Sequence, residues 1–101
     1  MQTSFTEEAI YSRLAVILGE ALRVDPARIG PEAKVFGDLG AESLDLLDIR
    51  FRVDEAFSVK TSAEDLVRSL GEGLSAEEVE ERLTVRSLVL YIESCLQSKV
   101  P

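Results

Sequence analysis

Apolar side chains in this sequence recur at the 3.6-residue period of an α-helix, and no segment alternates apolar and polar residues as a half-buried strand does. The helical period runs over about 5–23, about 43–57 and about 85–97. Ser4 and Glu7 fit a capping box at the start of the first segment. We therefore predict an all-α fold, a helical bundle with three main helices.

A further stretch, about 62–83, is long enough for two short helices before Thr84 caps the last one. Ser75 and Glu78 fit a second capping box, and Gly71 separates the two short helices. The predicted bundle is thus a single domain over 1–101 with an inserted pair of short helices.

The segment 24–42 is different because prolines and glycines interrupt any regular pattern in it. Loops of this length are uncommon in compact folds unless they are functional or support the core. We expect an ordered loop held to the core by its apolar residues, Ile29, Val35, Phe36 and Leu39.

Charge narrows the class of partner. Nineteen Asp and Glu residues against eleven Lys and Arg residues give a formal net charge of −8 in 101 residues. This charge repels phosphate backbones and anionic lipid headgroups, so we expect no nucleic-acid partner and no membrane insertion. The expected partners have basic surfaces.

Missing residue types exclude most enzyme classes. The chain has no His, and its single cysteine, Cys95, allows no internal disulfide, no Cys-His nucleophile pair and no zinc quartet. We expect no catalytic residue and no metal site. The segment Met1–Tyr11 lacks the features of a signal peptide, and no stretch approaches the ~18 apolar residues of a membrane span, so we expect a cytoplasmic protein.

One stretch carries a chemical signal, the run from Asp38 to Asp45, in which a glycine-containing loop leads to Ser43 at the start of the second helix. A structural interpretation makes Ser43 the N-cap. A functional interpretation makes it an exposed hydroxyl at a helix N-terminus, where free N–H groups stabilise an attached phosphate diester. Since no base stands ready to activate the hydroxyl, another enzyme would have to modify it.

Apolar residues of the second helix divide into two arcs around its axis, which predicts contact with the core on both sides. One arc holds Leu46, Ile49, Val53, Ala56 and Phe57, and the other holds Leu44, Leu47 and Phe51.

Two parts of the sequence resemble acyl carrier proteins. The first is the segment from Leu14 through Phe57, which contains the motif Asp38-Leu39-Gly40-Ala41-Glu42-Ser43-Leu44-Asp45. The second is the later run Thr84-Val85-Arg86-Ser87-Leu88, which is followed by Tyr91-Ile92. The resemblance implies that Ser43 bears a covalent 4′-phosphopantetheine arm, which a phosphopantetheinyl transferase installs from coenzyme A. The arm would hold acyl chains as thioesters, so the protein would be a carrier and not an enzyme. Two features depart from the family pattern: Glu42 replaces the usual Asp, and Arg50 and Arg52 interrupt an acidic helix.

The resemblance also implies a docking surface for acyl-loading, elongating or acyl-transferring enzymes, with the protein itself a monomer. Its residues would be Glu42, Leu44, Asp45, Asp48 and Glu55. The alternative is a solvated acidic face, with Leu44 an ordinary core residue.

The segment 58–83 is longer than the short third helix of ordinary carriers. In this respect the sequence resembles the specialised carriers of very long or unusual acyl chains, such as the lipid A type. Burial of a longer acyl chain rewards a larger apolar pocket. Candidates for such a pocket are Leu47, Phe51, Leu66, Val67, Leu70, Leu74, Val79, Leu83 and Leu88. The inserted residues could equally pack the short helices onto the bundle.

Two other functions stay open at this point: a peptidyl or polyketide carrier, and an unmodified adaptor that docks through its acidic helix. We interpret Cys95 as a small core or half-buried residue. The acidic cluster around Glu77–Glu81 lacks the spacing of a calcium loop and is interpreted as a solvated helix face.

Overall fold

The computed structural model describes residues 6–98, and this part of the chain is helical. The helices are α1 (Glu7–Leu22), a short 3-10 helix η1 (Pro26–Arg28), α2 (Ser43–Phe57), α3 (Ala63–Leu70), α4 (Ala76–Arg82) and α5 (Val85–Ser98). Within residues 6–98 no strand forms, although Lys34 and Thr84 make an isolated antiparallel bridge. The all-α prediction is confirmed.

Short polar side chains start the helices. Thr6 caps α1 by accepting the Ala9 N–H at 3.0 Å, whereas the predicted Ser4 lies outside the described residues. Ser62 caps α3 in the same way. Ser75 and Glu78 form the predicted capping box of α4. At the start of α5, the Thr84 hydroxyl accepts the Ser87 N–H at 3.1 Å, as predicted.

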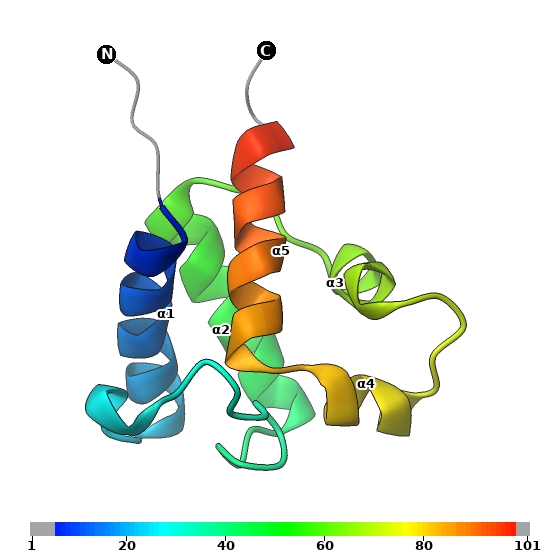
Figure 1. Cartoon of the computed structure of the whole chain (residues 1–101), viewed down its shortest axis with the longest axis horizontal. Helices are drawn as coiled ribbons and strands as arrows, with labels where there is room; N and C mark the ends of the chain where they lie inside the picture. Colours follow the sequence, from blue (N-terminus) through cyan, green and yellow to red (C-terminus); the bar gives the residue numbers. More distant parts are fainter. Residues whose placement is uncertain (1–5, 99–101) are drawn as a thin grey trace.

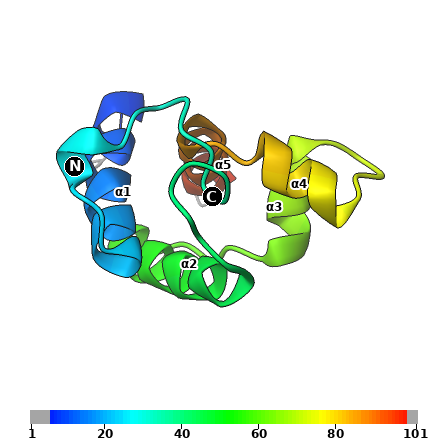
Figure 2. The same cartoon turned by 90° about the horizontal axis from the view of Figure 1, so that it is seen from below.

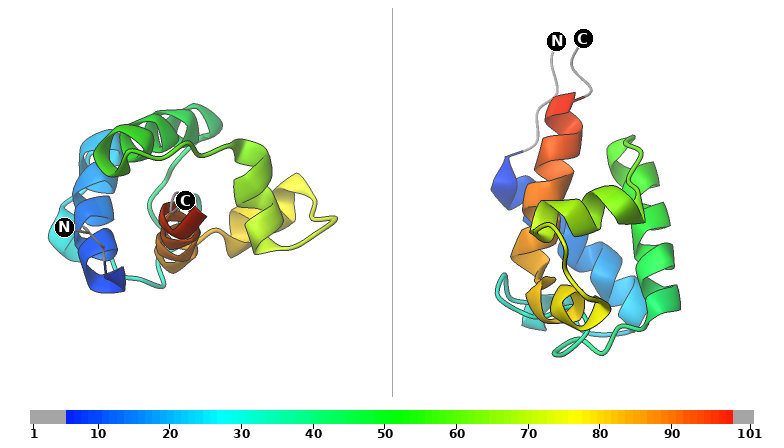
Figure 3. Two further views of the ribbon diagram at one scale, coloured as in Figure 1. Left: turned by 90° about the horizontal axis from the view of Figure 1, so that it is seen from above. Right: turned by 90° about the vertical axis from the view of Figure 1, so that its right-hand side faces the viewer.

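The three long helices form the body of the molecule, with α1 packed against both α2 and α5 (Figure 1). Helix α5 lies between α1 and the α3–α4 pair (Figures 2 and 3). Helix α3 contacts α5 and α4, so the inserted pair extends the bundle on one side. The N-terminal end of α2 and the loop before it lie at the same, lower end of the bundle as the start of α5 (Figure 1).

One hydrophobic core joins these elements. Each long helix contributes fully buried side chains, and the α2–α3 loop, α3 and the α4–α5 junction add others to the same cluster. Its largest fully buried members are Ile10, Leu14, Leu18, Ile49, Leu66, Leu83 and Ile92.

The loop between α1 and α2 is fastened to this body by long-range hydrogen bonds. Val35 N–H donates to the Leu83 carbonyl at 2.9 Å, and Val85 N–H donates to the Ala33 carbonyl at 3.0 Å. The Tyr11 hydroxyl donates to the carbonyl of Ile29. The expected apolar contacts are present, since Ile29 and Val35 are buried while Phe36 and Leu39 pack partly buried against the core. The loop therefore holds the start of α2 in a fixed place.

Candidate functional site

Ser43 is the first residue of α2, and its side chain is exposed. Three residues before it, Gly40 has a φ of +77°, a conformation that glycine adopts without steric cost. Between them Ala41 is buried and donates its N–H to the Val35 carbonyl at 3.1 Å. The loop thus turns sharply, anchors itself once in the core and presents Ser43 to solvent.

The structural interpretation of Ser43 as the N-cap is wrong, because the helix begins one residue earlier than that role requires. Glu42 is the N-cap residue, with extended backbone angles, and its own N–H donates to the Asp45 carboxylate at 2.9 Å. Ser43 therefore has no capping role. Among the described residues, its hydroxyl makes no hydrogen bond.

A phosphate ester on Ser43 fits this geometry. The backbone N–H groups of Ser43 and Leu44 belong to the first turn of α2 and have no helical acceptor. They point out of the positive end of the helix dipole, where an anionic group is favoured. The residues around the hydroxyl leave it accessible, since Glu42 and Leu44 on either side are exposed.

The second apolar arc of α2 does not reach the core, contrary to the sequence-based expectation. Leu44 is 79% exposed, Leu47 58% and Phe51 66%. Only the first arc packs into the core, where Ile49, Val53 and Phe57 are buried and Leu46 and Ala56 are partly buried. Leu44 is therefore not a core residue, and together with Leu47 and Phe51 it forms an exposed apolar strip that begins next to Ser43. Contiguous exposed apolar groups of this kind mark interaction surfaces.

Acidic side chains border the apolar strip. Glu42, Asp48 and Glu55 are exposed, and Asp45 is partly exposed. Arg52 Nε donates to the Asp48 carboxylate at 3.1 Å, an ion pair between residues four apart on α2. Arg52 also bonds Glu20 of α1 at 3.3 Å, a long-range contact that the sequence pattern could not reveal. One basic residue thus offsets part of the negative charge of this surface.

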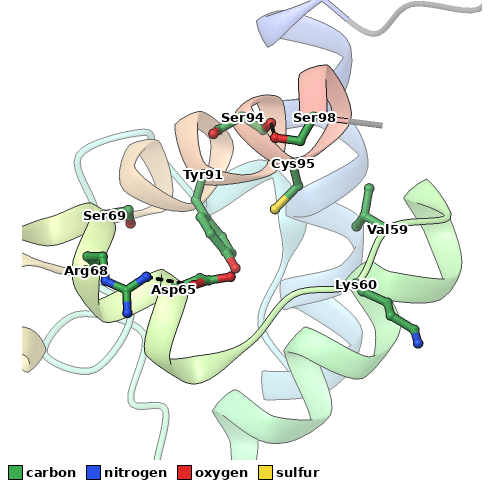
Figure 4. Close-up of a pocket in the computed structure, with 9 residues that line it drawn as sticks. All are labelled: Val59, Lys60, Asp65, Arg68, Ser69, Tyr91, Ser94, Cys95 and Ser98. Atoms are coloured by element: carbon green, nitrogen blue, oxygen red, sulfur yellow. Dashed lines mark hydrogen bonds and ion pairs between the residues drawn. The ribbon is translucent and has the colours of Figure 1, made fainter. Parts of the chain in front are cut away.

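The predicted acyl-pocket residues divide between the core and the surface of the molecule. Leu66 and Leu88 are buried in the core, and Leu70 is partly buried. By contrast, Leu47 and Phe51 are exposed on α2. A cavity of about 500 Å³ opens instead between α3 and α5, lined by residues of those helices and of the α2–α3 loop (Figure 4). None of the predicted pocket residues lines it; Leu70 lines a neighbouring cavity of about 460 Å³.

Cys95 and Tyr91 lie side by side in the cavity wall (Figure 4). Burial raises the pKa of the Cys95 thiol above its ordinary value of 9.0, so the thiol stays protonated and weakly nucleophilic. Burial likewise raises the pKa of Tyr91, whose hydroxyl accepts the Ser62 N–H at 3.2 Å. Half-buried Cys95 matches its structural interpretation.

Sequence reasoning missed the environment of Arg50, which is half-buried. Its Nη2 donates to the Thr61 carbonyl at 3.1 Å, so the side chain bridges α2 and the α2–α3 loop. Its Nε is buried and has no hydrogen-bond partner. Asp54, one turn further along α2, directs its carboxylate to the N–H and hydroxyl of Thr61 instead. A positive charge in an acidic helix was visible in the sequence, but an unsatisfied donor depends on tertiary contacts.

The part of the chain that the structure describes contains neither a candidate metal site nor a candidate membrane span. Over residues 6–98, no group of His, Cys, Asp or Glu side chains is arranged to hold a metal ion. None of the helices described has the length and apolar character needed to cross a membrane.

Comparison with known proteins shows the family of the chain. The sequence model of the family described as "Phosphopantetheine attachment site" matches residues 12–72. An "Acyl carrier protein AcpXL" of Rhizobium etli is 33% identical over 91 residues, which cover 90% of this chain and 97% of the relative. An "Acyl carrier protein" of Thermotoga maritima is 36% identical over 91 residues, covering 90% and 96%. Another from Helicobacter pylori is 31% identical over 85 residues, covering 84% and 92%.

These relatives match the chain over nearly their whole length, and the matched family segment includes the loop and all of α2. A prosthetic group of the 4′-phosphopantetheine type follows from the family, as does the role of a carrier that other enzymes act on. The chain belongs to the acyl carrier protein family.

Proposed function

We propose that Ser43 bears the 4′-phosphopantetheine arm and that the protein presents acyl thioesters on it to biosynthetic enzymes. The observation that carries the proposal is the exposed Ser43 hydroxyl at the first residue of α2, without a hydrogen-bond partner in the described chain. The matched family segment, residues 12–72, spans this position.

Attachment is a phosphoryl-group transfer from coenzyme A. Ser43 Oγ forms a new bond to the phosphorus that carries pantetheine. The bond from that same phosphorus to the bridging oxygen of the pyrophosphate breaks, and this oxygen leaves with the nucleotide as adenosine 3′,5′-bisphosphate. The hydroxyl proton passes to a base of the phosphopantetheinyl transferase, since no base stands beside Ser43 in sequence. The chain supplies the accessible hydroxyl and the first-turn N–H groups that favour the phosphodiester anion.

Incubation with coenzyme A, magnesium and a permissive phosphopantetheinyl transferase tests the assignment. We expect the intact mass to rise by one phosphopantetheine unit, and Ser43→Ala to prevent the gain. Ser12→Ala is the matched control, because Ser12 is also an exposed helical serine. Modification of Ser43→Ala, or of neither protein, contradicts the assignment. The adaptor function is supported instead if two results are obtained together. A partner binds Ser43→Ala and the unmodified wild type equally, and protein from native cells carries no arm.

The proposed docking surface consists of Glu42, Leu44, Asp45, Asp48 and Glu55. Leu44 supports it most directly, because a leucine that is 79% exposed beside Ser43 contributes little to the core. Exposed carboxylates around it would steer basic partner enzymes by long-range attraction without locking the complex. The acyl-handling partners would therefore meet α2 along its exposed face from Glu42 to Glu55, with the carrier acting as a monomer in the cytoplasm.

For the cargo, we propose long or unusual fatty chains of the kind used in lipid A or fatty acid biosynthesis. The inserted pair α3–α4 and the similarity to proteins named AcpXL support this over a peptidyl or polyketide cargo. The structure shows Leu66, Leu70 and Leu88 in or against the core, from which a chain would have to displace them. Mass spectrometry of the protein from its native cells reads the cargo directly; an aminoacyl or ketide mass contradicts the proposal.

A further inference from the structure

Arg50 stands out because its Nε–H is a buried donor that nothing satisfies. Arginine stays charged at all ordinary pH values and has five N–H donors and no acceptor. A buried donor without a partner costs free energy, so such groups in native proteins call for a ligand, a water or an ion to complete them. Among residues 6–98, Arg50 also takes part in no ion pair.

The position of Arg50 on α2 relates it to Ser43. The two residues are seven apart, which places them within about 20° of each other around the helix axis and about 10 Å apart along it. Leu47 lies between them on the same face. This face begins at the proposed attachment point and ends where Arg50 bridges α2 to the α2–α3 loop.

A tethered arm that lies along this face passes Arg50. Phosphopantetheine contains roughly three residue-sized units, each about 3.5 Å long when extended, so it covers the interval from Ser43. It offers two amide carbonyls, and an acylated arm adds a thioester carbonyl and, in some acyl chains, a hydroxyl. Each is a neutral oxygen acceptor that suits a charged N–H donor.

We propose that Arg50 is a positioning residue for the prosthetic arm: its Nε–H donates to a carbonyl or hydroxyl oxygen of the arm or its acyl group, holding the loaded arm along the Ser43–Leu47–Arg50 face of α2. The proposal rests on the proposed function of Ser43. The proposal explains why a basic residue stands at this position of an otherwise acidic helix: Arg50 would bind the arm and not a second protein. Arg52, two residues further on, is exposed enough to pair with Asp48 and Glu20 and has no unsatisfied group of this kind.

The test follows the Arg50 Nε–Hε signal by ¹⁵N-edited NMR, assigned by its loss in Arg50→Met. Four forms of the wild-type protein are compared: unmodified, phosphopantetheinylated, dodecanoylated and 3-hydroxydodecanoylated. We expect a downfield shift of the Hε resonance relative to the unmodified form. If the shift is already present in the phosphopantetheinylated form, the acceptor is an amide carbonyl of the arm. If it first appears in the dodecanoylated form, the acceptor is the thioester carbonyl. If it appears only in the 3-hydroxydodecanoylated form, the acceptor is the hydroxyl of the acyl chain.

Thermal unfolding gives the second readout. Attachment of the group that shifts the Arg50 signal should raise Tm in the wild type and in the control Arg52→Met, and Arg50→Met should lose part of that gain. An unchanged Hε resonance in all three loaded forms overturns the proposal, as does an equal Tm gain in Arg50→Met. Intact mass separates the two levels: absence of the added mass contradicts the assignment of Ser43, whereas normal mass with an unchanged Arg50 signal contradicts only the role of Arg50.

Discussion

The backbone N–H of Val35 donates a 2.9 Å hydrogen bond to the carbonyl of Leu83, and both side chains are fully buried. The bond joins the loop before α2 to the junction between α4 and α5, and the Val85–Ala33 bond beside it returns in the opposite direction. The junction that follows the inserted helices α3 and α4 is therefore hydrogen-bonded to the loop that leads to Ser43. Packing at Leu83 and the position of the attachment loop are parts of one arrangement.

Replacement of Leu83 by Ala should lower the free energy of unfolding by about 2–5 kcal/mol, because it leaves a cavity at a fully buried position. The loop should loosen as well, so hydrogen exchange at the Val35 amide should accelerate by more than exchange within α1. Urea denaturation and amide exchange measure the two effects.

Leu44→Ala provides the matched control, since the same side chain is removed at an exposed position. Its free energy of unfolding should stay within about 0.5 kcal/mol of the wild type. Similar losses in both variants would mean that Leu83 is not the packed anchor of the loop.

Gly40 sets the turn before Ser43 through its positive φ. A Cβ at this position meets no atom within 4 Å, so Gly40→Ala suffers from backbone strain and not from a clash. We expect a loss of about 1–2 kcal/mol in the free energy of unfolding and slower arm attachment, because the loop must distort. Gly30→Ala also has open space around the new Cβ but no left-handed conformation, and it should be tolerated. Equal stability and equal attachment rates in the two variants would contradict a turn role for Gly40.

The parts of this fold that could be predicted from the sequence depend on interactions between residues close together in the chain. Helix period and capping residues involve neighbours only three or four positions apart, so the α4 capping box and the cap at Thr84 could be predicted. Burial involves residues far apart in the chain. The two apolar arcs of α2 look alike in sequence, and only the packing of α2 against α1 and the shared core decides that Ile49 is buried while Phe51 is exposed.

The candidate site shows the same division. A glycine loop that leads to a serine at a helix start is a local pattern, and it identified Ser43. The N-cap shifted by one residue because the backbone angles of Glu42 are extended, a detail that composition does not determine. Arg50 could be noticed as an unexpected charge, but its contact with Thr61 and its unsatisfied Nε depend on where the α2–α3 loop lies.

Alkaline pH should destabilise the protein through Cys95. Burial holds the pKa of its thiol above the ordinary value of 9.0 in the folded state. Above about pH 9 the unfolded chain therefore binds fewer protons than the folded one, and the free energy of unfolding falls as pH rises, until the folded-state pKa is passed. Cys95→Ala should flatten this part of the decline in urea denaturation between about pH 8 and pH 10. Ser94→Ala, a non-titrating exposed neighbour, should keep the wild-type slope; a slope unchanged in Cys95→Ala would contradict the prediction.

Arg52 should slow the approach of basic partners, because it pairs with both Asp48 and Glu20 on the α2 side of the molecule. Arg52→Gln leaves these two carboxylates unpaired, so association with a phosphopantetheinyl transferase should become several-fold faster at low salt. The gain should vanish near 1 M salt, where the Debye length is about 3 Å. Arg68→Gln makes the same charge change on α3, where Arg68 pairs with Asp65, and it should have a smaller effect. Stopped-flow association rates decide between them: equal acceleration by both variants would mean that net charge alone, and not the α2 surface, steers the partner.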